Sequence, residues 1–294
     1  MTTTEDVRAR LFLLRATDPP ACAVRTYVAA HGPATAVEHI REGSAPRAVL
    51  TEIAQPDAQI GHDLRALDTG TARLLAPGDA QWPTARLAAL SRHGLGEPLG
   101  LWVRGPASLA ELTARAVTIT GSRAPTPRGT YVTADLAHDL ARTGVTIVSG
   151  AALGIDELAH RSGLAAHGAV VAVLACGIDQ VHPHQHAALF ADIVEAGGLL
   201  VSEYPVGARP TRLRAHARCR LLAALSAATV ITEARRRGGA LATAAAAYLL
   251  KRPLYAVPGP SGPGSAAAAN ALLRAGYALP ITTAEDITHL QERR

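Results

Sequence analysis

Aromatic residues and cysteines are scarce in this sequence. Phe, Trp and Tyr make up 3% of the 294 residues, so the core has to be built mainly from Ala, Val, Leu and Ile. The three cysteines, Cys22, Cys176 and Cys219, lie far apart and form no CxxC motif. This odd number and wide spacing argue against a disulfide framework and against a zinc site.

Targeting and membrane-spanning segments are not expected either. The first residues, MTTTEDVRARLFLL, place acidic residues before a very short apolar run, which is not the pattern of a signal peptide. The alanine-rich stretch 239–250 is too short to span a bilayer. We therefore expect a cytoplasmic protein with reduced thiols and no membrane contact.

The composition is that of a globular protein with an excess of basic over acidic residues. Hydrophobic residues make up 48% of the chain, and the net charge is +5 with His neutral. The length suggests one large domain and one smaller domain. The positive charge favours a polyanionic partner, although a charge of this size is a modest indication by itself.

The first part of the chain, residues 1–65, is expected to form a small helical, SAM-like domain. Val7, Leu11 and Leu14 share one helical face, and Gly/Pro turns separate several short helices. We favour a packing or protein-interaction role for this domain over a DNA-binding helical hairpin, because the hairpin lacks an obvious GxG.

The second part, residues 66–294, is expected to be a Rossmann-like α/β domain. Residues 66–115 are irregular apart from one strand at 99–103, and we interpret them as a connector that packs on the first edge of the sheet. Strands and helices then alternate, which predicts a doubly wound, mostly parallel sheet. The strands are expected at 117–120, 145–148, 169–174, 199–201, 228–232 and 253–257, and the helices at 130–143, 156–166, 184–196, 217–226, 240–250 and 266–275.

Two loops that follow strands carry glycine and polar residues, where open α/β sheets bind ligands. They are Gly121, Ser122 and Arg123 after the first regular strand, and 149–156 after the next. The glycines let the backbone approach an anion, and the helix starts that follow should offer unpaired N–H groups. We predict that Arg123 holds a phosphate, that Ser149 and Gly150 bind an anion through their backbone, and that Asp156 caps a helix.

The same loops lack the motifs of common nucleotide-dependent enzymes. The second loop is not GxGxxG, and it has no P-loop lysine. No nucleophile–base pair and no pair of carboxylates stands out at the strand ends. We therefore expect no catalytic residues, no cofactor and no enzymatic activity.

A basic run provides the strongest indication of a ligand. Residues 209–220, RPTRLRAHARCR, contain five arginines, one histidine and no acid, and a second run, Arg235 to Gly239, also follows a strand. A run of one sign repels itself unless a polyanion lies over it. Since the carboxyl ends of parallel strands share one edge, these runs should converge with Arg123 on one basic rim. Tyr204 is the one aromatic residue near it in sequence.

Three histidines, His182, His184 and His186, lie within five residues. This clustering raises a metal site as a hypothesis, but alternate positions in a turn do not converge as i and i+4 positions on a helix do. We favour exposed loop histidines and expect no metal.

Several of these motifs also carry a family resemblance. Gly121-Ser122-Arg123 with a glycine six residues later, SGAALGID, RCRLLAALS and EARRRGGALATA occur in one order, and from about Ala72 to Ala278 the chain resembles the DprA/Smf family (DNA-processing protein A). The resemblance implies a homodimer with an extended Rossmann-like domain that binds single-stranded DNA and loads the RecA recombinase during natural transformation. The DNA- or phosphate-binding residues implied by the matched motifs and the strand-end positions are Gly121, Ser122, Arg123, Ser149, Gly150, Arg212, Arg218, Arg220, Arg236 and Gly239.

The chain departs from the family pattern at defined positions. The family's F-P-x-R-N-R has Ala215 in place of the aromatic residue and Cys219 in place of Asn, and its Y-P-x-x-N has His182 and His186. Loss of a stacking aromatic is expected to cost roughly 1–3 kcal/mol per base. Because the chain ends about fifteen residues after the Rossmann pattern, we expect no C-terminal winged-helix domain.

Two alternatives stay open from the sequence. The rim could bind a nucleotide, as in the phosphoribohydrolases of the LOG (lysine-decarboxylase-like) group, although their PGGxGTxxE motif is replaced here by EARRRGGALATA. The chain could also be an interaction protein that has lost DNA binding through the changes at Ala215 and Cys219.

Overall fold

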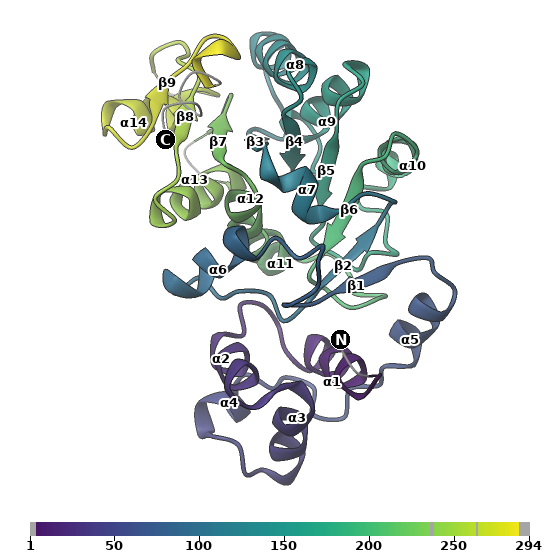
Figure 1. The fold of residues 1–294 in the computed structure, drawn as a ribbon. Coiled ribbons are helices and arrows are strands. Elements are labelled where there is room, and N and C mark those ends of the chain that lie inside the picture. The colour runs from purple at the N-terminus through teal and green to yellow at the C-terminus, as the bar shows by residue number, and fades with distance from the viewer. Residues whose placement is uncertain (1–3, 236–237, 263, 288–294) are drawn as a thin grey trace.

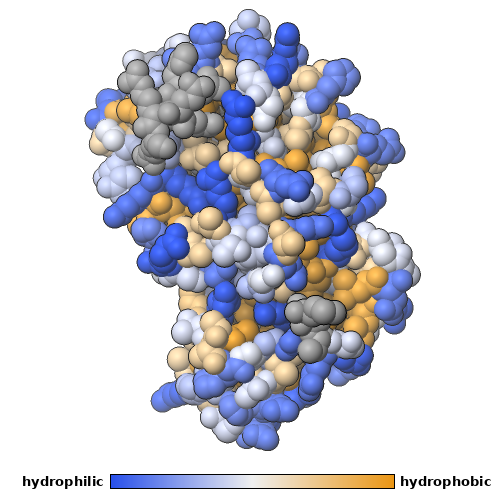
Figure 2. Space-filling view, viewed as in Figure 1, coloured by the Kyte–Doolittle hydropathy of each residue, from blue (hydrophilic) through white to orange (hydrophobic). Residues whose placement is uncertain are grey.

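The computed structural model describes residues 4–235, 238–262 and 264–287. A group of short helices lies at one end of the molecule and a sheet flanked by helices at the other (Figure 1). On the face shown in Figure 2, polar residues dominate, and a wide apolar area lies where the N-terminal helices approach the sheet. No helix in the described part of the chain is long and apolar enough to cross a membrane.

The N-terminal helices have a core of their own, which follows from their apolar faces. Leu13, Val24, Val37 and Ile40 are buried together there. The helices expected in this region are confirmed, and the last of them runs across the expected domain boundary at residue 65. They are α1 (Thr4–Ala16), α2 (Cys22–His31), α3 (Pro33–Glu42), α4 (Arg47–Thr51) and α5 (Gly61–Asp68).

The connector at 66–115 is more regular than the sequence pattern indicated. It contains β1 (Arg73–Leu75), α6 (Thr84–Arg92), β2 (Leu101–Arg104) and α7 (Leu109–Ala114). The expectation of an irregular segment with one strand is therefore wrong. Its elements are too short to show a hydrophobic period, and α7 is marked mainly by its cap, since the Ser108 hydroxyl accepts a hydrogen bond from the Glu111 N–H.

The remaining elements alternate as predicted, with two differences. One is a last strand, β9 (Leu279–Pro280), which was not expected. The other is a separate short helix, which the basic run forms before the expected helix at 217–226. The strands are β3 (Ala116–Thr120), β4 (Thr146–Ser149), β5 (Val170–Val173), β6 (Leu199–Ser202), β7 (Ala228–Ile231), β8 (Leu254–Ala256) and β9 (Leu279–Pro280). The helices are α8 (Pro127–Arg142), α9 (Ile155–Ala165), η1 (His184–His186), α10 (Ala187–Glu195), α11 (Arg212–Ala217), α12 (Cys219–Leu225), α13 (Gly239–Leu249) and α14 (Ala267–Arg274).

The strands form one sheet with the order β1-β2-β6-β5-β4-β3-β7-β8-β9. The pairs from β6 to β9 are parallel, and β1 and β2 add antiparallel strands at the β6 edge. The predicted mostly parallel, doubly wound α/β fold is confirmed. The chain order reverses between β3 and β7, and such a switch point is where open α/β sheets bind ligands.

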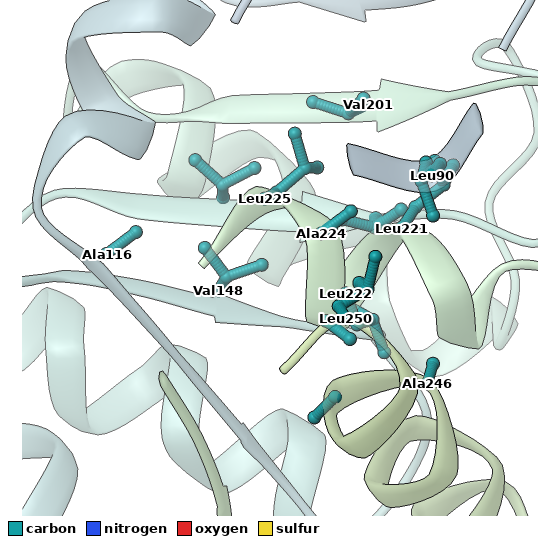
Figure 3. Packing of buried hydrophobic residues seen from close by; sticks show 14 of the residues in the cluster. Leu90, Ala116, Val148, Val201, Leu221, Leu222, Ala224, Leu225, Ala246 and Leu250 are labelled. Atoms are coloured by element: carbon teal, nitrogen blue, oxygen red, sulfur yellow. The ribbon is translucent and has the colours of Figure 1, made fainter. Parts of the chain in front are cut away.

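Side chains on the two faces of the sheet enter two separate cores. Ile147 and Val170 pack with α8, α9 and α10, whereas Val148 and Val171 pack with α6, α12 and α13. Figure 3 shows α12 in the second core, with Leu225 beside Val148 and Val201 of the sheet and Leu222 beside Leu250 at the end of α13. Each fully buried leucine stabilises the fold by roughly 1.5–3 kcal/mol. Because α12 is fixed in this way, the basic run before it is held at the switch point.

Candidate nucleic-acid interface

A cavity of about 570 Å³ lies at the switch point. Its walls come from the loop after β3, the start of α9, the loop after β7, and helices α11, α12 and α13. Gly121, Ser122, Arg123, Arg212 and Gly239, which the sequence singled out, all line this cavity. The structure therefore brings these five residues together from three separate segments of the chain.

Three exposed arginines surround this cavity. Arg123, Arg212 and Arg235 line it, and none of the three forms an ion pair within the described residues. We call these three residues the arginine rim. Guanidinium groups without a carboxylate partner are available for bidentate contacts to phosphate. Arg236, which the sequence also singled out, lies outside the described residues.

The N-terminus of α13 adds to the positive potential. Gly238, Gly239 and Ala240 line the cavity, so the first turn of this 11-residue helix faces it. A helix N-terminus carries a partial positive charge and favours an anion. The predicted site residue Gly239 thus lies at a helix start, where its backbone is close to the arginine rim.

At the starts of α8 and α9, hydrogen-bond donors are already paired with acceptors of the protein. The Glu233 carboxylate accepts hydrogen bonds from the Thr126 N–H at 3.1 Å and from the Thr126 hydroxyl at 2.5 Å. At α9, the Ile155 N–H donates to the Ser122 carbonyl at 3.0 Å. The expectation of unpaired N–H groups is therefore wrong for these donors, because a buried carboxylate and a loop carbonyl already accept their hydrogen bonds.

Asp156 does not cap α9 as predicted. Gly154 lies at the N-cap position, and Asp156 is inside the helix. Its buried carboxylate accepts hydrogen bonds from the Thr120 hydroxyl at 2.7 Å and from the Ala152 N–H at 3.3 Å. Asp156 therefore joins the loops after β3 and β4, and the cap prediction failed because this partner lies 36 residues away.

Arg218 lies at the bottom of the cavity and is only 8% exposed. Its guanidinium donates to the Gly150 carbonyl and, at 3.2 Å, to the Val173 carbonyl. A Cβ atom at residue 150 would lie 2.5 Å from Nη2 of Arg218, so a side chain there would displace this guanidinium. Arg218 thus fixes the loop after β4, and any contact with phosphate would be an additional role.

Arg220 faces away from the cavity into a buried ion pair. Its guanidinium donates to both carboxylate oxygens of Glu203, at 2.6 and 2.8 Å, and its Nε donates to the Leu95 carbonyl at 2.9 Å. Burial alone would lower the pKa of Arg220, but the Glu203 carboxylate raises it above its usual value. Most of its donors are occupied by protein acceptors, and its role in phosphate binding stays a prediction.

Ser149 and Gly150 lie beside the cavity. The buried Ser149 hydroxyl donates to the Ile119 carbonyl at 2.6 Å, so this side chain joins two strands. Gly150 lines a second hollow of about 340 Å³, which Arg123 and Arg212 also border. Their backbone contacts with an anion stay a prediction.

The histidines of the loop after β5 separate into two kinds. His182 and His184 are exposed, as expected, but His186 is buried, which corrects the expectation for that residue. Its Nδ1 lies 3.1 Å from the Ala151 carbonyl, and its Nε2 lies 3.1 Å from a Glu157 carboxylate oxygen. His186 therefore contacts the loop after β4 at Ala151, one residue beyond the carbonyl that Arg218 contacts. Across the described residues, no three His, Cys, Asp or Glu side chains gather as a metal site.

The cavity offers little aromatic surface. Tyr204 is buried, and its hydroxyl donates to the Arg214 carbonyl at 2.9 Å, so its ring is not available to a base. Ala215 lines the cavity, where the family pattern has an aromatic residue. Burial raises the pKa of the Cys219 thiol, which therefore stays protonated and adds no negative charge to the cavity. Among the described residues that line the cavity, His216 supplies the one ring.

The chain is similar to several known proteins. A profile of the family described as DNA recombination-mediator protein A matches residues 73–292. A Mycobacterium tuberculosis relative, provisionally named DNA processing protein DprA, is 41% identical over 292 residues, which are 95% of this chain and 74% of that protein. Protein Smf of Escherichia coli is 35% identical over 74% of this chain and 56% of its own length.

Two solved structures are also similar. DNA processing protein A from Helicobacter pylori, described in terms of its single-stranded DNA binding mode, is 27% identical, with a TM-score of 0.65 over 76% of this chain and 97% of that one. DprA from Streptococcus pneumoniae shares the fold, with a TM-score of 0.78 over 98% of both chains at 24% identity. From the profile match and the 41% identical relative, the chain belongs to the DNA recombination-mediator protein A (DprA/Smf) family.

Proposed function

We propose that the arginine rim binds the phosphodiester backbone of single-stranded DNA and that the protein catalyses no reaction on it. The observation that carries this proposal is the convergence of three exposed arginines, without ion-pair partners among the described residues, on one cavity at the switch point. Family membership supports DNA as the polyanion, and the Helicobacter pylori relative is described as binding single strands.

The geometry suggests how a strand would be held. Arg123 and Arg235 come from two loops and Arg212 from the start of α11, so each would contact a different phosphate along a flexible chain. The first turn of α13 would add backbone N–H donors beside them. Contacts of this kind are independent of sequence and release counterions, so binding should weaken as salt increases.

Membership of the family also suggests a cellular role for DNA binding. We propose that the protein acts in the cytoplasm as a homodimer and loads the RecA recombinase onto single-stranded DNA during natural transformation. Relatives named DNA processing protein DprA from Bacillus subtilis and Streptococcus pneumoniae support a role in DNA processing. The rim would then hold the strand while a recombinase is delivered.

The test is a fluorescence-anisotropy titration of a labelled single-stranded oligonucleotide at two salt concentrations, with a duplex of the same length as control. We expect salt-dependent binding that prefers the single strand. In the double variant Arg123→Ala/Arg212→Ala, the slope of log affinity against log salt should be smaller by about 1.4, since each lost single-strand contact contributes about 0.7.

A matched control is available at the opposite edge of the sheet. Arg142 and Arg274 are exposed and end helices that return from the carboxyl ends of strands. Arg142→Ala/Arg274→Ala has the same net charge as the rim variant and should keep nearly full affinity. Full, salt-sensitive affinity of the rim variant would overturn the proposal. Turnover of a nucleoside monophosphate would instead support the nucleotide-processing alternative.

A further inference from the structure

Helix α11 separates the arginine-lined cavity from a larger apolar groove. Arg212 and Ala215 line the cavity, whereas Leu213 and Ala217 line a groove of about 730 Å³, and His216 borders both. No residue of α11 is buried, so both of its flanks are open. A charged surface and an apolar surface thus lie on the two sides of one short helix.

The 730 Å³ groove beside Leu213 is apolar and exposed. We call it the α11 groove, and besides α11 its walls come from Pro19 and Pro20, from Leu95 and from the alanine-rich face of α13, including Leu249. Leu213 is 83% exposed and Leu249 is 49% exposed. Large apolar side chains gathered in one exposed hollow mark a binding surface more often than chance exposure does.

The charged groups at the edge of the groove are already paired. Arg214 forms an ion pair with Asp18 at 3.2 Å, and Arg220 is paired with the buried Glu203. The groove is therefore close to neutral, in contrast to the arginine rim across α11. A second anion would gain little there, but an uncharged, flat group would bury apolar surface against Leu213 and Leu249.

We propose that the α11 groove binds the bases of the same DNA strand whose phosphates contact the arginine rim. This inference rests on the proposed function. A nucleotide has a charged phosphate on one side and a base with apolar faces on the other, which matches Arg212 and Leu213 on the two flanks of α11. The cavity lacks a stacking aromatic at Ala215, and the lining of the groove is more strongly apolar than that of the cavity.

The chemistry of the groove also determines its selectivity. Leucine, proline and alanine side chains provide contact area without hydrogen-bond donors or acceptors. Bases bound there would be distinguished by size and not by their Watson–Crick edges, as is usual for single-strand binding without sequence readout. The groove would thus add affinity for base-bearing strands and leave the salt dependence unchanged.

The experiment compares two labelled ligands with equal numbers of phosphates, a base-bearing oligonucleotide and an abasic one. Wild-type protein should bind the abasic strand about fivefold or more weakly, in line with losing one or more base contacts. Leu213→Ser/Leu249→Ser should bind both strands with the affinity that wild type has for the abasic strand. Its salt slope should stay that of wild type.

Two further variants serve as controls. Leu279→Ser removes a leucine of similar exposure far from α11, on β9, and should behave as wild type. Leu213→Phe should tighten binding of the base-bearing strand only, because it adds a ring for stacking. Both changes are at exposed positions, and unchanged melting temperatures would show that the fold is intact.

Each outcome is decisive. Full affinity of Leu213→Ser/Leu249→Ser for the base-bearing strand, or equal binding of both strands by wild type, would overturn the inference while leaving the arginine rim intact. The groove would then be free for a protein partner. Absence of binding to either strand at low salt would overturn the proposed function together with this inference.

Discussion

Arg212 and Arg220 belong to one basic run, yet the fold places them in opposite environments. Arg212 is exposed beside the cavity without an ion-pair partner among the described residues, whereas Arg220 is 6% exposed and bound bidentately by Glu203. Arg218 lies between these extremes, since it borders the cavity and also holds two backbone carbonyls. The same residue type is therefore left open to solvent at one position and stabilises the fold at another.

The comparison has a physical basis. A guanidinium in water keeps its donors free for phosphate and contributes little to stability through surface ion pairs. A buried guanidinium has to be paired, and removing one partner leaves an uncompensated buried charge. Variants of the two kinds should therefore separate into those that change DNA binding and those that change unfolding.

The largest expected effect is on Arg220. Arg220→Ala leaves the Glu203 carboxylate buried without its partner and should lower the free energy of unfolding by about 3–5 kcal/mol. Urea denaturation of the wild type and the variant would measure this difference in the free energy of unfolding. Arg212→Ala, in the same run, should change the free energy by less than about 0.5 kcal/mol. Equal stability of the two variants would show that the buried ion pair of Arg220 contributes no more to stability than the exposed Arg212 side chain.

Arg218 should show an intermediate behaviour. Arg218→Met leaves the carbonyls of Gly150 and Val173 without this donor, and a buried group that loses its hydrogen bond costs roughly 1–3 kcal/mol. We expect a loss of stability in that range in urea, together with weaker DNA binding, because the loop after β4 loses one of its supports. A variant that weakened binding with no loss of stability would show that Arg218 acts on the ligand alone.

A buried histidine extends the comparison to pH. Burial lowers the pKa of His160 to about 3, so the folded protein keeps it neutral while the unfolded chain takes up a proton below about pH 6.5. Its contribution to stability is complete above pH 6.5 and is lost as the pH falls towards 3. At pH 5 the loss is about 2 kcal/mol, at about 1.4 kcal/mol per pH unit.

Urea denaturation of His160→Met between pH 7 and pH 4 would test this. The variant should lack this part of the pH dependence, whereas His184→Gln, which changes an exposed histidine, should retain it. If the wild type and His160→Met lose stability in parallel as the pH falls, His160 titrates alike in the folded and unfolded chain.

The smallest expected effect is on Arg235. Arg235→Ala removes one exposed cation of the rim, so the slope of log affinity against log salt should be smaller by about 0.7, with no measurable change in stability. The titration described above would measure it, with Arg142→Ala as the control. An unchanged slope would show that Arg235 does not contact a phosphate of the strand.

Much of the fold could be predicted from the sequence. The β-branched strands, the helices between them and the order of the loops follow from local patterns, and the parallel sheet was expected from their alternation. The short helices α6, α7 and α11 were not expected, because six to nine residues are too few to establish a helical period against a basic or irregular background.

The candidate site could be predicted only in outline. Arg123, Arg212 and Gly239 were expected at one edge and do line one cavity. The interior roles of Asp156 and His186 were missed, since their partners, Thr120 at the end of β3 and Ala151 in the loop after β4, belong to other segments of the chain. An acidic residue or a histidine near the start of a helix has no local pattern that identifies a partner 35 or 36 residues away.

The sequence by itself determined that arginines follow the carboxyl ends of strands, because the periods of strand and helix set where each loop falls. Only the tertiary structure decided which of these arginines are open to a ligand. That choice depends on the acceptors that packing brings within reach, Glu203 for Arg220 and the carbonyl of Gly150 for Arg218. Such contacts join residues 17 and 68 positions apart, and they exist only once the sheet and α12 have packed together.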